Sequence, residues 1–279
     1  MIPDRPPQKP TAPERLTAAE RRAWREDGFF VRERLFGPEE LDELRGAAER
    51  CVKLAEQAMQ RSEDVYAIDG NVYHEAGGST VQLEHTPGSK TIRVIEPFHH
   101  LDDTMNRLID DPRLVEPMRD LIGDERVCLY TDKLNLKRPR EGSGFGWHQD
   151  SPYWAHFAPE LDRLPNVLVA LDDADEENGC FRVIRGSHRR GLLPGREGEG
   201  RLGPLFTDPT AFDLEDQVPA AMPAGSAIFF SPHTVHGSES NRSDALRRAL
   251  VITYQPGSPD GRRMFKVDRT RFAGEREPS

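Results

Sequence analysis

Cysteine is scarce in this sequence, and long apolar runs are absent. The chain of 279 residues has only three cysteines, Cys51, Cys128 and Cys180, which lie far apart. An odd number of widely spaced cysteines fits neither a disulfide framework nor a zinc ribbon. No apolar run approaches the roughly 18 residues that a membrane-spanning helix needs, and the N-terminal stretch has no apolar core that would direct export. We therefore expect a protein of the reducing cytoplasm.

Positive charge is also in short supply. The sequence has 48 acidic and 38 basic residues, which gives a formal net charge of -10 at pH 7. Such a chain has no general attraction to nucleic acid or to an anionic membrane. We expect neither of them as a partner, and the sequence does not indicate an oligomeric state.

The first part of the chain has the spacing of helices. Residues 1–15 are rich in proline and polar side chains, and we expect them to form a disordered tail before a single domain that spans residues 16–279. Thr17 and Glu20 predict a capping box at the start of the first helix, and Gly123 is expected to end the third. The three stretches that predict helices are 16–30, 37–58 and 102–123, the last one broken around Pro112.

The rest of the chain is dominated by short runs of β-branched, leucine and aromatic residues between turn residues. We expect strands in 91–98, 126–137, 166–174, 180–187, 226–232 and 247–255. Helices followed by many short strands predict a mainly β fold with flanking helices, in which an antiparallel sandwich or jelly roll is wrapped by the helices. The segment 191–216, rich in glycine and charge, is expected to be an insertion that acts as a lid.

Candidate metal ligands occur in two places. In GFGWHQDSPYW, His148 and Asp150 lie two positions apart, so on a strand both side chains would point to the same face. SPHTVHGS supplies His233 and His236, and we favour His236 because Gly-Ser follows it and Arg247 stands eleven positions later. Two imidazoles and one carboxylate form the facial triad of non-haem Fe(II) sites. The same ligand types also serve zinc hydrolases, so ligand type alone leaves the metal open.

Arg247 narrows the choice of cofactor. It begins an apolar strand, where a guanidinium can bind a carboxylate through two parallel hydrogen bonds. A dicarboxylate that chelates iron at one end and meets an arginine at the other is what 2-oxoglutarate would need.

Four spaced motifs in this order resemble a known family. EDGFFV, HQD followed by YW, ENGCFRVIRGSH and HGSESNRSDALR resemble the signatures of the phytanoyl-CoA dioxygenase family of Fe(II)/2-oxoglutarate oxygenases, to which ectoine hydroxylases belong. The resemblance extends over 16–255. It implies a double-stranded β-helix, which is a cupin-like jelly roll. It also implies a dioxygenase that uses Fe(II), 2-oxoglutarate and O2 to hydroxylate an unactivated C–H bond of a small molecule, with release of succinate and CO2.

The resemblance also assigns roles to residues. It implies His148, Asp150 and His236 as iron ligands, and Arg247 as the partner of the distal carboxylate of 2-oxoglutarate. The further residues that it places at the cosubstrate are Asn135, Ser238, Phe145, Lys133 and Arg93. Because Asp150 is present, where halogenating relatives have a small residue, halogenation is not expected.

The substrate is less well indicated by the sequence. Thr131 stands where ectoine hydroxylases carry a glutamine for the substrate, so ectoine is not expected, and we place Thr131, Ser151 and Trp154 near the substrate. Two alternatives to the oxygenase remain. One is a metal-dependent cupin-type hydrolase or isomerase that does not use 2-oxoglutarate, and the other is a non-catalytic binding module on the same fold.

Overall fold

The computed structural model describes residues 15–156, 158 and 160–257. The expectation of a disordered tail concerns residues 1–15, of which 1–14 lie outside the described residues. The end of the expected domain, residues 258–279, lies outside them as well.

Helices form in all three predicted stretches, but the first helix ends at Glu26, and Phe29 and Phe30 of the stretch 16–30 belong to a strand instead. Thr17 caps the first helix, because its hydroxyl accepts a hydrogen bond from the Glu20 amide (3.2 Å) while the Glu20 carboxylate accepts one from the Thr17 amide (2.8 Å). The third stretch divides before Pro112 and ends at Gly123, which adopts a left-handed conformation with φ of 70°. The helices are α1 (Ala18–Glu26), α2 (Pro38–Met59), α3 (Asp103–Leu108), α4 (Pro112–Ile122) and the short α5 (Ser151–Trp154).

The strands form two antiparallel sheets. The larger sheet has the order β1-β11-β8-β13-β6-β5-β4-β3-β2, and the smaller has the order β10-β9-β12-β7. The six strands that were predicted are β5 (Ile92–Glu96), β6 (Val127–Lys137), β8 (Asn166–Ala170), β9 (Phe181–Ile184), β11 (Ala227–Phe230) and β13 (Arg247–Pro256). The others are β1 (Phe29–Arg32), β2 (Val65–Ile68), β3 (Asn71–Ala76), β4 (Ser79–Leu83), β7 (Phe145–His148), β10 (Gln217–Ala220) and β12 (His236–Ser238).

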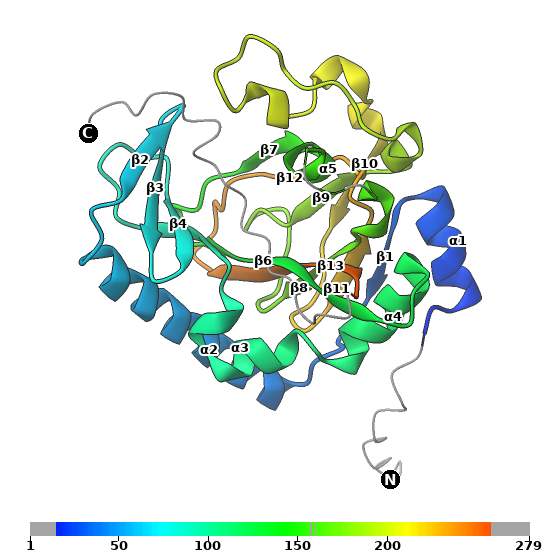
Figure 1. Cartoon of the computed structure of the whole chain (residues 1–279), viewed down its shortest axis with the longest axis horizontal. Helices are drawn as coiled ribbons and strands as arrows, with labels where there is room; N and C mark the ends of the chain where they lie inside the picture. The colour runs from blue at the N-terminus through cyan, green and yellow to red at the C-terminus, as the bar shows by residue number, and fades with distance from the viewer. Residues whose placement is uncertain (1–14, 157, 159, 258–279) are drawn as a thin grey trace.

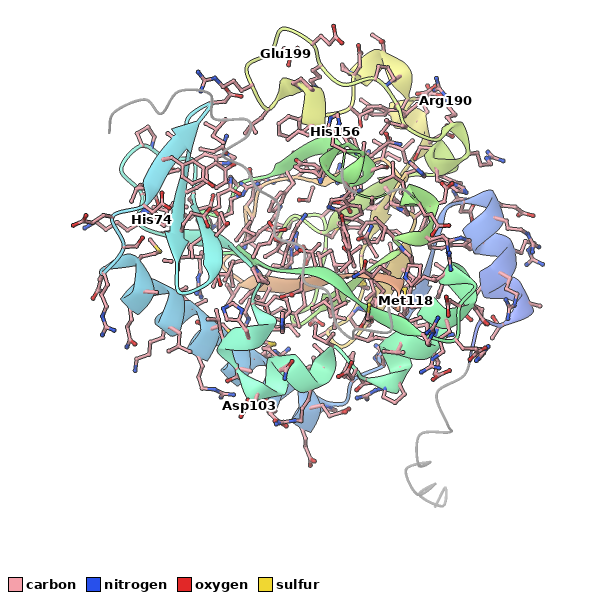
Figure 2. All side chains as sticks on the ribbon, viewed as in Figure 1. His74, Asp103, Met118, His156, Arg190 and Glu199 are labelled. Atoms are coloured by element: carbon pink, nitrogen blue, oxygen red, sulfur yellow. The ribbon has the colours of Figure 1, made fainter. Side chains whose placement is uncertain are left out.

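The two sheets make the expected double-stranded β-helix. Figure 1 shows α2, α3 and α4 along one side of the large sheet and the small sheet on its other side. Leucine, alanine and valine side chains of α2 pack with the apolar side chains of β8, β11 and β13 in one large core. The strands of the two sheets, with helices beside them, confirm the mainly β fold with flanking helices, and Figure 2 shows how side chains pack around the ribbon.

The hairpins β2–β3 and β3–β4 were not predicted. Asp69 and Gly70 connect β2 to β3 with φ angles of 49° and 77°, and Gly77 and Gly78 connect β3 to β4 with φ angles of 61° and 85°. Positive φ at both central residues defines the tight turn that favours Asp-Gly and Gly-Gly in two-residue hairpins. These strands extend the large sheet beyond β5.

The segment 191–216 lies at the end of the molecule opposite α3, as Glu199 and Asp103 show in Figure 2. It contains the short 3-10 helices η4 (Gly203–Leu205), η5 (Pro209–Ala211) and η6 (Leu214–Asp216). Leu202 and Leu205 pack against Tyr66, Ile68 and Tyr73 of β2 and β3. The segment therefore lies over the open side of the β-helix and contacts the hairpin that extends the large sheet.

Two further observations concern the described residues as a whole. None of the helices in that part of the chain is long and apolar enough to cross a membrane. Cys51, Cys128 and Cys180 are all free thiols, and Cys51 and Cys180 are buried.

Candidate active site

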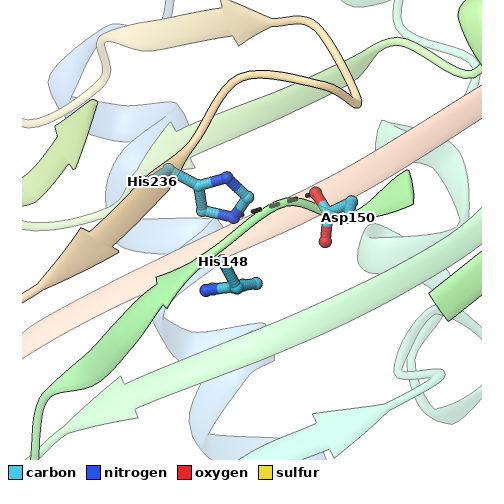
Figure 3. Close-up of side chains that lie close together, drawn as sticks. All are labelled: His148, Asp150 and His236. Carbon is cyan, nitrogen blue, oxygen red and sulfur yellow. Dashed lines mark ion pairs between the residues drawn. The ribbon is translucent and has the colours of Figure 1, made fainter. Parts of the chain in front are cut away.

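The structure brings His148, Asp150 and His236 together inside the β-helix. One ligand atom from each residue lies within 4.8 Å of the others, and Figure 3 shows the three side chains turned toward a common point. His148 ends β7 and His236 begins β12, where they are paired directly across the small sheet. Asp150 lies beyond the end of β7, so the turn into α5, and not the pleat of a strand, brings its carboxylate to the histidines.

The backbone fixes which ring nitrogen faces the common point. Nδ1 of His148 lies 2.7 Å from the carbonyl of Gly146, and Nδ1 of His236 lies 2.9 Å from the carbonyl of Thr234. Because a carbonyl only accepts hydrogen bonds, each Nδ1 carries the proton and each Nε2 keeps its lone pair. This is the state in which histidine binds a metal.

The charges at the site also suit a metal. Burial, together with the neighbouring His236, lowers the pKa of His148 to about 3, and burial likewise lowers the pKa of His236. Both imidazoles are therefore neutral at physiological pH. Burial by itself would raise the pKa of Asp150, but Lys133 and the two histidines outweigh it, so the pKa is lowered and the carboxylate is ionised.

His233, the competing candidate ligand, is engaged elsewhere. Its Nδ1 lies 2.7 Å from the hydroxyl of Ser151, and its Nε2 lies 2.8 Å from a carboxylate oxygen of Asp162. The Ser151 hydroxyl donates to the carbonyl of Pro232 (2.7 Å). His233 and Ser151 thus hold the loop before β12 against the start of α5.

Gln149, between two of the candidate ligands, has a structural part in the site. Its side-chain amide donates to the carbonyls of Gly191 (2.8 Å) and His233 (2.6 Å), and its carbonyl accepts from the amide of Leu193 (2.8 Å). The residue is fully buried. It joins the segment that carries His148 to the loop before β12 and to the first residues of segment 191–216.

A cationic region lies on the large sheet across the cavity from the candidate ligands. Arg247 is 4% exposed and donates to the carbonyl of Gly179 (2.6 Å), while its Nε has no hydrogen-bond partner among the residues that the structure describes. The carbonyl oxygen of the Asn135 side chain also lacks one. Polar atoms buried without partners are costly and rare, and both residues line the cavity. The Nε of Arg247 fits an anionic acceptor, and the carbonyl oxygen of Asn135 fits a group that donates a hydrogen bond.

Arg93 adds a second buried guanidinium. It lies 3.8 Å above the ring of Phe145, donates to the carbonyl of Gly144 (2.7 Å), and is 3.8 Å from the carboxylate of Glu84. Its Nε, too, has no partner among the described residues. Burial lowers the pKa of Arg93 to about 10, so this arginine remains a cation.

Lys137 was missed by the sequence analysis. It is fully buried, is paired in register with Arg247, and donates a hydrogen bond to the Ser238 hydroxyl (2.9 Å) and another to the carbonyl of Glu239. Burial and the nearby arginines lower its pKa to about 6. A signal was present in DKLNLK, because Lys137 follows Lys133 and Asn135 at spacings of two, and these three side chains point to one face of β6.

These groups surround a cavity of about 150 Å³. Lys133, Asn135, Phe145, Ser238, Arg93 and Arg247 all line it, together with the three candidate metal ligands. The sequence analysis missed the part of the wall that comes from β3 and β4, whereas it expected the segment 191–216 to act as a lid. It did not single out the individual residues by which α5 and this segment reach the cavity. The lining residues from those segments are Asn71, Tyr73, Gln82, Tyr153, Leu202, Leu205 and Phe206.

The three residues expected near the substrate are not part of this lining. Thr131 is buried and contacts Glu96 (3.3 Å). Trp154 is fully buried, and its ring meets that of Tyr130 edge to face at 5.3 Å. Ser151 is buried against Pro232 and His233. All three are buried but do not line the cavity.

Dioxygenases that depend on iron and 2-oxoglutarate combine a double-stranded β-helix with an open site of two imidazoles and one carboxylate, and this protein is of that class. The chain belongs to the phytanoyl-CoA dioxygenase family, because the family described as Phytanoyl-CoA dioxygenase (PhyH) matches residues 24–249.

Individual relatives agree with this assignment. L-proline trans-4-hydroxylase from Streptomyces griseoviridis is 32% identical over 187 residues, which are 60% of this chain and 68% of the relative. Ectoine dioxygenase from Bordetella bronchiseptica is 30% identical over 253 residues, which are 86% of this chain and 75% of the relative. The crystal structure of EctD from S. alaskensis with 2-oxoglutarate and 5-hydroxyectoine has a TM-score of 0.67 and 25% identity, and the match covers 98% of this chain and 88% of that one.

The protein is therefore an enzyme that uses Fe(II), 2-oxoglutarate and O2. The oxygenase is favoured over a cupin-type hydrolase or isomerase, and over a binding module without activity. Relatives of known activity act on small molecules, such as ectoine.

Proposed function

We propose that this enzyme hydroxylates an unactivated C–H bond of a small molecule. In this reaction 2-oxoglutarate is decarboxylated to succinate, one oxygen atom of O2 enters succinate, and the other becomes the hydroxyl group of the product. Decarboxylation of the cosubstrate supplies two of the four electrons that reduce O2, and the C–H bond supplies the other two. We further propose that the enzyme works in the reducing cytoplasm, which suits its three free cysteines.

One observation carries the proposal. Three ligand atoms within 4.8 Å of one another stand in the same cavity as a buried arginine whose Nε lacks a partner. His148, Asp150 and His236 would hold the iron through two neutral nitrogens and one carboxylate oxygen. This leaves coordination positions for a chelating ligand and for O2. When bound, the iron and 2-oxoglutarate supply the oxidising chemistry, and the protein supplies binding, orientation and exclusion of water.

The residues of the large sheet would hold the cosubstrate. Arg247 would bind the distal carboxylate with two parallel hydrogen bonds, since its Nε has no partner. Ser238 already accepts a hydrogen bond from Lys137, so its own proton is directed to another acceptor, for which a cosubstrate carboxylate is suitable. Arg93 would keep this end of the cavity positive, and its guanidinium would fix the ring of Phe145.

Two histidines, one in the cavity and one at the surface, provide a direct test. We expect His236→Gln to lower both iron-dependent formation of succinate and the visible absorbance of the anaerobic protein with Fe(II) and 2-oxoglutarate, by on the order of a hundredfold. His100→Gln is the control, because His100 is exposed and does not line the cavity. It should retain both signals within about threefold. Equal losses in the two variants, or full activity in His236→Gln, would contradict the ligand assignment.

A further inference from the structure

The cavity has two chemically different ends. Along β6, the register with β13 places Lys137 opposite Arg247, then Asn135 opposite Ala249, and then Lys133 opposite Val251. Each step of two residues along a strand covers about 6.8 Å. Lys133 is therefore far from the arginine end, where the proposed function places the distal carboxylate of the cosubstrate.

Lys133 lies beside the candidate metal ligands. Its ammonium nitrogen is 3.7 Å from a carboxylate oxygen of Asp150 and 5.6 Å from the centre of the Tyr153 ring. Its side chain is 17% exposed and lines the cavity. A divalent ion at Asp150 would draw the carboxylate toward itself and repel the ammonium group, because its charge exceeds that of the single carboxylate.

The charges of the loaded site leave Lys133 without a counter-charge. The two positive charges of the metal ion balance the two negative charges of the cosubstrate. The positive charge of Arg247 balances the negative charge of Asp150. Arg93 has Glu84 at 3.8 Å behind the wall. Lys137 is buried behind the wall, where its ammonium nitrogen is bound to the Ser238 hydroxyl and the carbonyl of Glu239. A positive charge in a partly closed cavity favours a negative partner more strongly than the same charge in water.

The described residues that line the cavity offer a positively charged substrate no free carboxylate. Asp150 is the one carboxylate among the described residues that line the cavity, and it is a candidate metal ligand. The wall opposite the metal offers neutral polar groups from Asn71, Gln82 and Tyr73, together with apolar side chains from segment 191–216. An isolated ammonium group would lose its water there without gaining a negative partner.

The size of the cavity limits the substrate as well. The cavity has a volume of about 150 Å³. The cosubstrate takes up a large part of that space. Leu202, Leu205 and Phe206 lie over the remainder. The space left beside the cosubstrate therefore suits a small substrate, or a small part of a larger one.

We infer that the substrate is a small molecule with a carboxylate or phosphonate group, and that Lys133 binds this group beside the metal. The inference rests on the proposed function and names the substrate class of the same site. In this inference Lys133 binds the substrate, whereas the family resemblance placed this residue at the cosubstrate.

The test uses four probes of similar length: butanoate, propylphosphonate, butylammonium and butan-1-ol. The protein is loaded with Fe(II) and saturating 2-oxoglutarate without oxygen, and each probe is titrated while the visible absorbance is followed. We expect the two anions to bind at least about tenfold more tightly than the ammonium and the alcohol. Binding of butylammonium as tight as that of butanoate would overturn the inference.

Lys133→Gln identifies the group responsible, and Lys53→Gln, at an exposed position on α2, is the matched control. Lys133→Gln should lose most of the preference for anions, while Lys53→Gln keeps it. An anion that merely coordinates the iron would keep its affinity in Lys133→Gln, and that result would also overturn the inference. So would a Lys133→Gln variant that binds 2-oxoglutarate at least about tenfold more weakly yet still prefers anions.

The same experiment separates this inference from the proposed function. The absorbance change on adding 2-oxoglutarate to the Fe(II) protein, and the slow formation of succinate in air, require no probe. If both are absent, the proposed function fails and the inference fails with it. If both are present but the probes show no preference for anions, the inference alone fails.

Discussion

A single side chain, Lys137, shows how strongly position determines chemistry in this protein. A lysine in water is a cation, but this one is fully buried between Ser238 and the backbone of Glu239, with Arg247 opposite it. Burial and the like charges of Arg247 and Arg93 make protonation unfavourable. The lysine therefore gives the Ser238 hydroxyl a hydrogen-bond donor while adding little charge to the unloaded site at neutral pH.

This leads to a prediction about pH. An unfolded chain keeps a lysine protonated up to about pH 10.4, whereas the folded protein holds the pKa of Lys137 at about 6. Between these two pH values the unfolded state binds more protons at this lysine than the folded state does. The free energy of unfolding therefore rises with pH, by up to about 1.4 kcal/mol per pH unit, and the lysine destabilises the fold less. Below about pH 6 this contribution is constant.

We therefore expect Lys137→Met to be more stable than the unsubstituted protein at about pH 6, and this advantage to shrink at about pH 7 and 8. The measurement is urea unfolding of both proteins without metal or cosubstrate. The difference between their free energies of unfolding is taken at each pH, because the titration of all other groups then cancels. A difference that does not change with pH would contradict the low pKa of Lys137.

At the scale of elements, the hairpin β2–β3 and the segment 191–216 together close the cavity. Asp69, in the turn of the hairpin, accepts a hydrogen bond from the amide of Leu202 (2.7 Å). Around it, Leu202 and Leu205 pack with Tyr66, Ile68 and Tyr73. The hairpin is thus the support on which the segment rests, and a charged hydrogen bond of this kind contributes about 1.5–3 kcal/mol.

Asp69→Gly should loosen the segment. Glycine removes the carboxylate but tolerates the positive φ of 49° at this position, so the turn itself remains unstrained. We expect amide hydrogen exchange in residues 197–206 to become on the order of tenfold faster, and the amount of succinate formed without substrate to rise. Asp69→Asn keeps an acceptor oxygen and a residue that favours the turn, and should stay close to the original rate. Equal exchange in all three proteins would show that Asp69 does not hold the segment.

At the scale of the whole molecule, the candidate site joins the two sheets. His148 and His236 belong to β7 and β12 of the small sheet, whereas Asn135 and Arg247 belong to β6 and β13 of the large one. A cosubstrate that bound the metal and the arginine at the same time would connect the sheets across the cavity. The iron and the cosubstrate should therefore stabilise the fold together more than the sum of their separate effects.

We expect anaerobic thermal unfolding to show a rise in the melting temperature with Fe(II), a further rise with 2-oxoglutarate, and little effect of 2-oxoglutarate after the metal is removed by a chelator. A ligand at a hundredfold excess over its dissociation constant stabilises by about 2.7 kcal/mol. Arg247→Met should keep the effect of the metal and lose most of that of the cosubstrate. Equal stabilisation by 2-oxoglutarate with and without metal would argue against a cosubstrate that bridges the sheets.

The sequence was sufficient for the features that depend on local spacing. The leucines of α2, the cap at Thr17 and the glycine after α4 define helices by themselves, and short apolar runs define six of the strands. The residue types and spacing of the motifs also singled out His148, Asp150, His236 and Arg247, and the structure places all four at one cavity. The hairpins β2–β3 and β3–β4 were not predicted, although Asp-Gly and Gly-Gly stand between their strands and are typical of two-residue hairpin turns.

Contacts between distant segments were decided by the tertiary structure. Lys133 and Lys137 carry the same side chain on the same face of β6, yet one lines the cavity beside Asp150 and the other is buried behind its wall. Trp154 and Tyr153 are adjacent in sequence, and only Tyr153 faces the cavity. Local sequence sets the direction of a side chain relative to its own strand or helix. Its surroundings come from β3, β4, β13 and the segment 191–216, which are brought there by the packing of the two sheets.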